Sequence, residues 1–214
     1  RQTPALPTGL EEVPPEDSVS QGFASAGASW GTLAGFAELR GGEALSGFDD
    51  LPQPTLAEAR LQLRGQALVG PFDLALTTDL LADASAPDHA LRLNQGDGWL
   101  DLREASMSFR PSDALDVRLG RQILTWGTGD LVFINDLFPK DWNAFILGRD
   151  EDYLKAPSDA IRLALFNAVV NADLVYTPEF DADRFIDGTR VAFYDAASGT
   201  IVGTNRPVQS QRPD

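Results

Sequence analysis

Residues 57–67 read AEARLQLRGQA, and apolar and polar side chains alternate along this stretch without a break. A period of two places the two sets on opposite faces of a β-strand. A helix is excluded as an interpretation, because it would spread the charged side chains around its whole circumference. The stretch is longer than the about five or six residues of a usual soluble strand and falls within the about 9–11 residues of a membrane-spanning strand.

Weaker alternation of the same kind recurs along the chain and predicts an all-β fold. The phase changes near Arg103 and Glu104, which predicts a β-bulge at this point. A turn is expected at 195–199, followed by the start of a short ninth strand at 200–204. The other predicted strands are 29–40, 72–80, 99–110, 115–126, 159–166, 172–177 and 189–195.

The predicted connections between strands alternate between long and short. Tight turns are expected at 70–71, 111–113 and 167–171, and long loops at 41–54, 83–97, 127–157 and 178–188. Short turns at one end and long loops at the other are typical of bacterial outer-membrane barrels. The predicted fold class is therefore an antiparallel up-and-down transmembrane β-barrel, with about eight or nine strands in this chain. A soluble sheet with one wet face is the alternative, because its strands alternate in the same way.

The chain is strongly acidic, with 32 acidic against 17 basic residues among 214 and a formal charge of −15. Nucleic acid is not an expected partner, since phosphate binding needs a basic surface and none is visible. The acids concentrate in the termini and loops, where they either solvate the loops or bridge to lipopolysaccharide through divalent cations. The absence of cysteine excludes disulfides and thiolate chemistry.

One part of the chain resembles a known family. Its motifs are LGRQILTWG at 119–127, GD at 129–130, NDLFPKD at 135–141 and, one strand earlier, LREA at 102–105. They resemble motifs of large bacterial outer-membrane porin-like barrels, a group related to the alginate-export and phosphate-selective porins, over residues 95–180. Phe138 stands where the family usually has Asn, so a different local turn is expected there. Members of the group are considerably longer, so the resemblance implies the N-terminal portion of a larger barrel.

Three parts are expected along the chain. Residues 1–22, rich in Pro and acid, are predicted to form a flexible arm, residues 23–204 the barrel strands, and residues 205–214 a polar tail or a truncated continuation. No signal peptide is visible, so the chain is either cytosolic or a mature form whose leader has been removed. The barrel interpretation favours the mature form and predicts the outer membrane of a Gram-negative bacterium.

In a barrel, the apolar positions of each strand face lipid and the polar positions face the lumen. Mixed charges along the lumen would filter solutes by size and charge. The predicted lumen-lining residues are Glu58, Arg60, Gln62, Arg64, Gln66, Asp73, Asp79, Asp101, Arg103, Asp116, Arg118 and Arg162.

The loop 127–157 is too long for a simple connector and unusually apolar for an exposed loop. It is expected to fold into the lumen as a constriction or plug. The alternatives are an ordinary surface subdomain and a patch that binds a partner. Arg121, at the root of the loop, is a candidate partner for Asp130 or Asp136. The residues assigned to the constriction are Arg121, Trp126, Asp130, Asp136, Lys140, Asp141 and Arg149.

No feature of the sequence indicates an enzyme. The lone His89 lies in a polar loop, and no spacing typical of metal ligands or of a nucleophile with its base occurs, so no catalytic residue, metal or cofactor is predicted. The predicted function is a porin-like channel that passes a small solute across the outer membrane, surrounded by lipid and lipopolysaccharide. One alternative is a structural barrel or sleeve that holds an envelope protein partner. Another is a soluble β-sandwich that binds carbohydrate.

Overall fold

The fold is taken from a computed structural model, which describes most of the chain between residues 22 and 202. The described residues are 22–28, 31–43, 56–85, 91–125, 138–186, 192–196 and 199–202. The predictions for residues 1–21 and 205–214, and for His89, Trp126, Asp130 and Asp136, lie outside these ranges.

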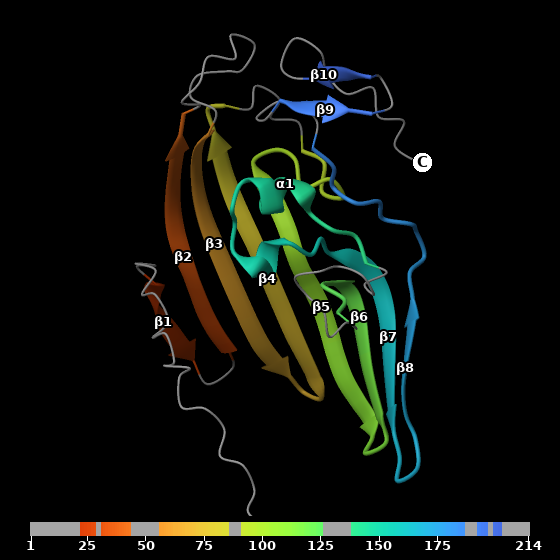
Figure 1. Ribbon diagram of the computed structural model, residues 1–214. Coiled ribbons are helices and arrows are strands. Elements are labelled where there is room, and N and C mark those ends of the chain that lie inside the picture. Colours follow the sequence, from red (N-terminus) through yellow and green to blue (C-terminus); the bar gives the residue numbers. More distant parts are fainter. Residues whose placement is uncertain are drawn as a thin grey trace, which may run out of the picture.

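An antiparallel sheet of eight strands dominates the described part of the chain (Figure 1). The strands lie in chain order, so each pairs with the strand before it and the strand after it. They are β1 (Gly22–Ala28), β2 (Gly31–Gly42), β3 (Leu56–Val69), β4 (Phe72–Asp83), β5 (Leu100–Ser112), β6 (Leu115–Gln122), β7 (Ser158–Phe166) and β8 (Asn171–Tyr176). The predicted antiparallel all-β class is confirmed. Among the described residues β1 pairs only with β2 and β8 only with β7, so the sheet is not closed into a barrel there.

Long and short connections alternate between the strands, as the sequence predicts (Figure 1). β3 and β4 are joined by Gly70 and Pro71, and Gly70 has a φ of 61°, a conformation that glycine adopts at little cost. The connections β5–β6 and β7–β8 are also short, whereas β2–β3, β4–β5 and β6–β7 are long. The long connections therefore gather at one end of the sheet.

The bulge predicted near Arg103 is present in β5. Thr77 of β4 pairs with Glu104, and the next residue, Thr78, pairs with Leu102, so Arg103 is the extra residue in the register. Arg103 is only 3% exposed. The bulge thus adds a buried arginine at the end of the sheet where the long connections lie.

Two parts of the strand prediction are wrong. Residues 22–28 form β1, although no strand was expected before residue 29. Of the strand expected at 189–195, the described residues 193–195 form β9 (Phe193–Asp195), which pairs with β10 (Thr200–Val202) in a separate hairpin and not with the main sheet as described. The turn between them is where the sequence places it, with the Gly199 amide donating to the Asp195 backbone carbonyl at 2.8 Å.

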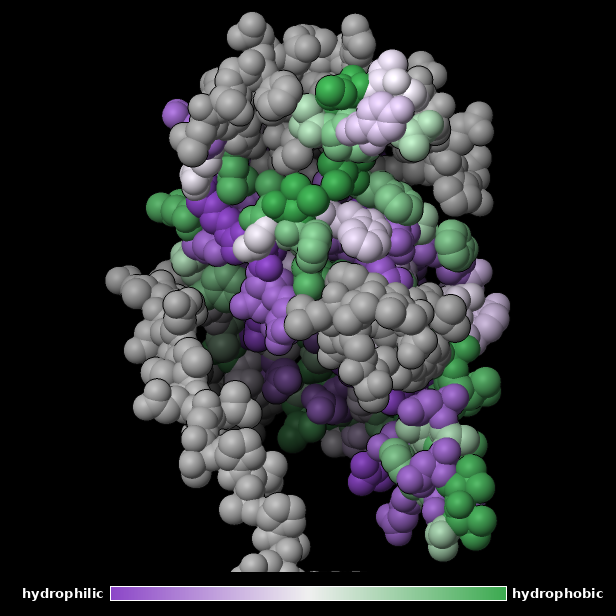
Figure 2. All heavy atoms as spheres, in the orientation of Figure 1, coloured by the Kyte–Doolittle hydropathy of each residue, from purple (hydrophilic) through white to green (hydrophobic). Residues whose placement is uncertain are grey.

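The main sheet buries polar side chains on one face and exposes apolar ones on the other. Gln62 and Asp79 are 1% and 0% exposed, whereas Leu39 and Leu76, on the opposite face of the strands, are 86% and 48% exposed. Figure 2 shows the loop-covered side of the molecule, where hydrophilic and hydrophobic side chains lie next to each other. The two buried apolar clusters of the described residues are small and consist of Leu124, Phe138 and Ala160, and of Ala144, Tyr153 and Leu154.

The β6–β7 connection contains the helix α1 (Trp142–Ile146) and the single 3-10 turn η1 (Glu151–Tyr153), which lie over the polar face of the sheet (Figure 1). Asp141 caps α1, because its Oδ1 accepts a hydrogen bond from the Ala144 amide at 2.8 Å. Neither helix in the described ranges has the length and apolar character needed to cross a bilayer.

Candidate functional site

The candidate site is the polar face of the sheet where the β6–β7 loop covers it. The strand register brings its polar residues into rows. Gln62 of β3 lies opposite Asp79 of β4, which in turn lies opposite Asp101 of β5. All three are at most 4% exposed. Because a buried carboxylate is costly unless it is paired, these residues need partners from the arginines around them.

Arg60 and Arg149 supply part of that pairing. Arg60 donates to Glu58 at 2.8 Å and to Asp79 at 3.2 Å. Arg149, which follows α1 in the loop, donates to the second Glu58 oxygen at 2.6 Å. Glu58 therefore joins a strand arginine to a loop arginine, and this contact attaches the loop to β3.

Tyr153 of η1 is held between two arginines of the sheet. The guanidinium carbons of Arg60 and Arg103 lie 4.2 and 4.5 Å from its ring centroid, which is the geometry of a cation–π contact. Its hydroxyl accepts a hydrogen bond from Gln62 Nε2 at 2.6 Å. Burial, reinforced by the nearby charge of Asp79, raises the pKa of Tyr153 to about 12. Tyr153 therefore remains protonated at neutral pH and fills the space above the strands.

Arg103 attaches the same turn through its backbone. Its Nη2 donates to the carbonyl oxygens of Asp152 and Lys155 at 2.7 and 2.9 Å, and its Nη1 lies 3.5 Å from Asp101 Oδ2. A single side chain from the β5 bulge thus fixes both ends of a four-residue segment.

Arg184, from the segment after β8, joins the loop to the sheet from the other side. It donates to both oxygens of Asp101 at 3.1 and 3.2 Å and to Asp141 at 3.2 Å. Its backbone amide donates to the Lys140 carbonyl at 2.8 Å, and its carbonyl accepts from the Trp142 amide at 3.0 Å. Burial alone would lower the pKa of Arg184, but the two carboxylates raise it above its ordinary value. Arg184 is therefore a permanent cation that holds a strand, a loop and a third segment together.

We refer to these eight charged residues as the ion cluster. They are Glu58, Arg60, Asp79, Asp101, Arg103, Asp141, Arg149 and Arg184. Four carboxylates and four arginines give a formal charge of 4 − 4 = 0, and each is joined to at least one opposite charge. The cluster therefore attracts ions of neither sign, and its main effect is to fix the position of the loop.

All the predicted lumen-lining residues lie on this one face of the sheet, but the loop divides them. Those it covers are Glu58, Arg60, Gln62, Asp79, Asp101 and Arg103. Those towards the short turns are more exposed and are Arg64, Gln66, Asp73, Asp116, Arg118 and Arg162. The exposed charges also form pairs, such as Arg162 with Asp173 at 3.2 Å and Arg118 with Glu104.

The residues assigned to the constriction have different surroundings. Asp141 and Arg149 belong to the ion cluster, and Lys140 Nζ donates to the Phe138 carbonyl at 3.2 Å. Arg121 is buried and donates to the carbonyl oxygens of Leu93 and Leu102 at 2.8 and 2.7 Å, so it holds the β4–β5 connection against β5. Its suggested partners in the loop lie outside the described residues.

Sequence reasoning missed two residues of the site, Tyr153 and Arg184. A weak signal existed for Arg184, which is the only basic residue in the otherwise acidic stretch 178–188. Tyr153 carries no comparable signal, because a single aromatic residue in a charged loop is compatible with many environments.

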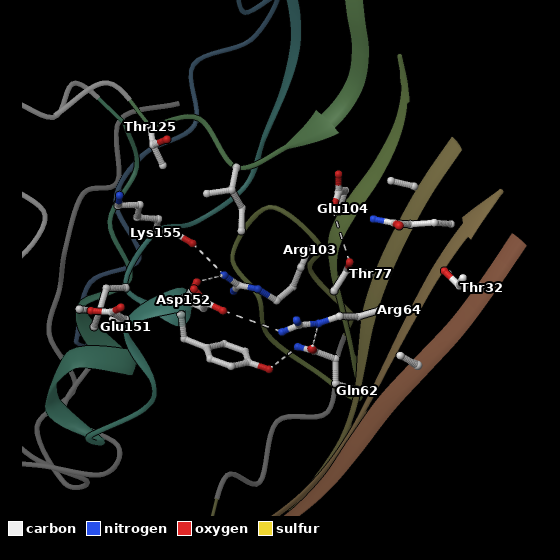
Figure 3. Close-up of a pocket in the computed structure, with 17 residues that line it drawn as sticks. Thr32, Gln62, Arg64, Thr77, Arg103, Glu104, Thr125, Glu151, Asp152 and Lys155 are labelled. Carbon is white, nitrogen blue, oxygen red and sulfur yellow. Dashed lines mark hydrogen bonds and ion pairs between the residues drawn. The ribbon is translucent and has the colours of Figure 1, made fainter. Parts of the chain in front are cut away.

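A cavity of about 510 Å³ lies beside the ion cluster, between η1 with the residues that follow it and strands β2 to β5 (Figure 3). In the described ranges, no group of three or more acidic or histidine side chains is arranged to hold a metal ion.

A scan against protein-family models found no match for this chain, and searches of curated proteins and of solved structures found none either. The resemblance to porin-like barrels therefore remains a prediction from the sequence motifs.

Proposed function

We propose that this chain forms part of an outer-membrane channel that passes a small solute, with the loop 127–157 as its constriction or plug. The observation that supports this most strongly is the inverted distribution of side chains in the sheet. Charged residues are buried under the loop on one face, while large apolar residues are exposed on the other.

Lipid is the environment in which this distribution is favourable. Leu39, Leu174 and Ile161 are 86%, 61% and 41% exposed, and the strand register places all three on the apolar face. Exposing apolar area to water costs about 25 cal/mol per Å², whereas contact with acyl chains removes that cost. The strands β3 to β5 have 12 to 14 residues, which is enough to cross the hydrocarbon layer at a tilt.

The two edge strands of the main sheet, β1 and β8, need hydrogen-bond partners if the sheet lies in a membrane. In a bilayer every backbone amide and carbonyl needs a partner, so the free sides of β1 and β8 must pair. Closure into a barrel, with each other or with further strands, satisfies both edges. The proposed protein is therefore a closed barrel in the outer membrane, surrounded by lipid and lipopolysaccharide.

A structural sleeve is the second candidate, and the ion cluster favours it. The described part of the loop is attached directly to Glu58 and Arg103 and, through Arg184, to Asp101, so it covers much of the polar face near the long connections. A path closed permanently at this point would leave a barrel that holds an envelope protein rather than one that conducts. The β-sandwich alternative is less well supported, because a sandwich buries its apolar face against a second sheet. Within the described ranges, the only other sheet is the β9–β10 hairpin.

The test is to refold the full chain into lipid vesicles and measure two properties. Electrophoresis with and without boiling should show a heat-dependent change in mobility, as expected for a closed membrane barrel. Planar-bilayer recordings should then show conductance above the lipid background. A mobility change without conductance would favour the sleeve, and a chain that folds in water without lipid would refute the membrane assignment.

A further inference from the structure

We propose that the cavity beneath η1 binds an uncharged, polyhydroxylated solute of the sugar class. This inference rests on the proposed channel function, because it names the kind of solute that the constricted part of the path would admit. The cavity of about 510 Å³ falls within the range of roughly 300–1,000 Å³ that small-molecule sites occupy. It is formed by two sides of different origin, the strands and the loop.

The charge of the cavity is balanced although the chain is strongly acidic. Its charged lining residues are Arg64, Arg103, Lys155, Glu104, Glu151 and Asp152. Three bases and three acids give 3 − 3 = 0, against −15 for the whole chain. The surface facing the cavity therefore offers no net attraction to an anion or to a cation.

Most of these charges are also occupied. Arg103 donates to two carbonyl oxygens of the loop and lies 3.5 Å from Asp101. Glu104 accepts hydrogen bonds from Arg118 and, at 3.0 Å, from Ser106. Arg64 donates to Gln62 and approaches Asp152 at 3.9 Å. A charged solute that displaced the buried Arg103 from Asp101 would leave a carboxylate uncompensated, which is unfavourable. The Arg64–Asp152 pair is 50% and 72% exposed and opposes separation only weakly.

Neutral hydrogen-bonding groups occupy the rest of the polar wall. Thr32 of β2 lies opposite Gln66 of β3, and Thr77 of β4 lies opposite Arg64. Thr125, beyond the end of β6, and Gln62 and Tyr153 complete the neutral polar lining of the cavity. The Gln62 amide donates to the Tyr153 hydroxyl at 2.6 Å, and the Thr77 hydroxyl donates to Glu104 at 3.4 Å. A threonine hydroxyl and a glutamine amide can each donate and accept, which matches the donor and acceptor capacity of sugar hydroxyls.

Figure 3 shows how these groups are distributed. Thr32, Arg64 and Thr77 lie on the strand side of the cavity, and Glu151 and Asp152 lie on the loop side. A molecule between them would contact both, and paired ions such as Arg64 with Asp152 still form strong hydrogen bonds to neutral hydroxyls. The lining of the cavity has no net charge and contains several groups that can both donate and accept hydrogen bonds. These two properties together favour a sugar as the ligand.

The test measures binding of three pyranose probes of similar size to the full chain in detergent micelles by isothermal titration calorimetry. Glucose is neutral, glucuronate is anionic and glucosamine is cationic. Glucose should bind more tightly than both charged probes. Gln66→Leu and Thr32→Val should each weaken glucose binding by about two- to tenfold, the ratio expected for one lost hydrogen bond. The control Gln95→Leu lies in the β4–β5 connection outside the cavity lining and should leave the affinity unchanged.

The inference is overturned if either charged probe binds more tightly than glucose, or if both cavity variants bind glucose like the wild-type chain. Conductance measured in parallel separates this result from a failure of the channel proposal. Glucose binding that depends on Gln66 without conductance would support the site and refute the channel. Conductance without such binding would support the channel and refute the site.

Discussion

Replacing Arg184 with methionine should release the loop 138–157 from the polar face of the sheet. The Arg184 guanidinium donates to Asp101 at 3.1 and 3.2 Å and to Asp141 at 3.2 Å. Its side chain is 3% exposed. Methionine keeps an apolar stem of similar length but removes the charge, so two buried carboxylates lose the partner they share.

The expected change in the free energy of loop opening depends on which other contacts Asp101 and Asp141 keep when Arg184 is replaced. Removing one partner of a buried ion pair costs about 3–5 kcal/mol. Asp101 would still lie 3.5 Å from Arg103, and Asp141 would still accept from the Ala144 amide at 2.8 Å. The lower end of the range, about 3 kcal/mol, is therefore expected for the free energy of loop opening. This corresponds to a rise of about 10²-fold in the population of the open loop.

Amide hydrogen exchange on the full chain in lipid vesicles, read by mass spectrometry at peptides covering 138–157, measures that population. The matched control is Arg162→Met, because Arg162 contacts Asp173 at 3.2 Å but is 36% exposed. A pair of this exposure contributes about 0–1 kcal/mol, so the control should change exchange by no more than about fivefold. Adding Asp141→Asn to Arg184→Met should slow exchange again, because the second substitution removes the negative charge of a buried carboxylate that has lost its arginine partner. Equal exchange in the two single variants would refute the idea that the ion cluster holds the loop.

Other substitutions test the contacts of Tyr153, the backbone conformation at Gly96 and the apolar face of the main sheet. Tyr153→Phe keeps the ring between the arginines and should raise loop exchange by at most about tenfold, whereas Tyr153→Leu should raise it further because each cation–π contact contributes about 0.5–2 kcal/mol. Tyrosinate absorbance should show Tyr153 ionising near pH 12, above the ordinary tyrosine pKa of 10.0. The stability that protonated Tyr153 contributes should be complete below pH 10.0 and lost as the pH rises towards 12. Gly96→Ala should increase loop exchange in the same direction as Arg184→Met but by less, because Gly96 has a φ of 67° and an added Cβ would collide with the Arg184 guanidinium. Leu76→Arg should destabilise the chain in lipid by about 2–4 kcal/mol, measured by urea titration in vesicles, while Gln66→Arg on the polar face should not; equal losses would contradict the lipid-facing assignment.

Alternation along a strand could be read from the sequence because it is a local property of the backbone. Residues 57–67 have one polar set and one apolar set, and the structure places these sets on the two faces of β3. The phase change at Arg103 was visible for the same reason. β1 escaped prediction because its sequence, GFASAGA, has almost no large side chains whose alternation could be detected.

Burial within the polar face could not be read in the same way. Alternation shows which residues share a face but does not show what covers that face. Asp101 and Arg184 are 83 positions apart in the chain, and the sequence between them does not indicate that they meet. The pairing depends on where two long connections fold, which is decided by tertiary contacts rather than by local pattern.

The ion cluster raises the question of why a loop is held by charges rather than by apolar packing. Replacing a buried ion network with well-packed apolar side chains is often neutral or stabilising, so stability alone does not account for the cluster. The need to fix the loop in one position is the better explanation of the cluster. Each arginine pairs with particular oxygen atoms, so a shifted loop would leave charges unpaired. Under this hypothesis, the double variant Arg184→Met with Asp141→Asn, in which Asp101 keeps Arg103 as its partner, would keep the loop protected from exchange but would let it occupy more than one position. Distances measured by double electron–electron resonance between spin labels on the loop and on β3 should then broaden relative to the wild-type chain. A single narrow distance in the variant would show that the Arg184 ion pairs are not needed to define where the loop lies.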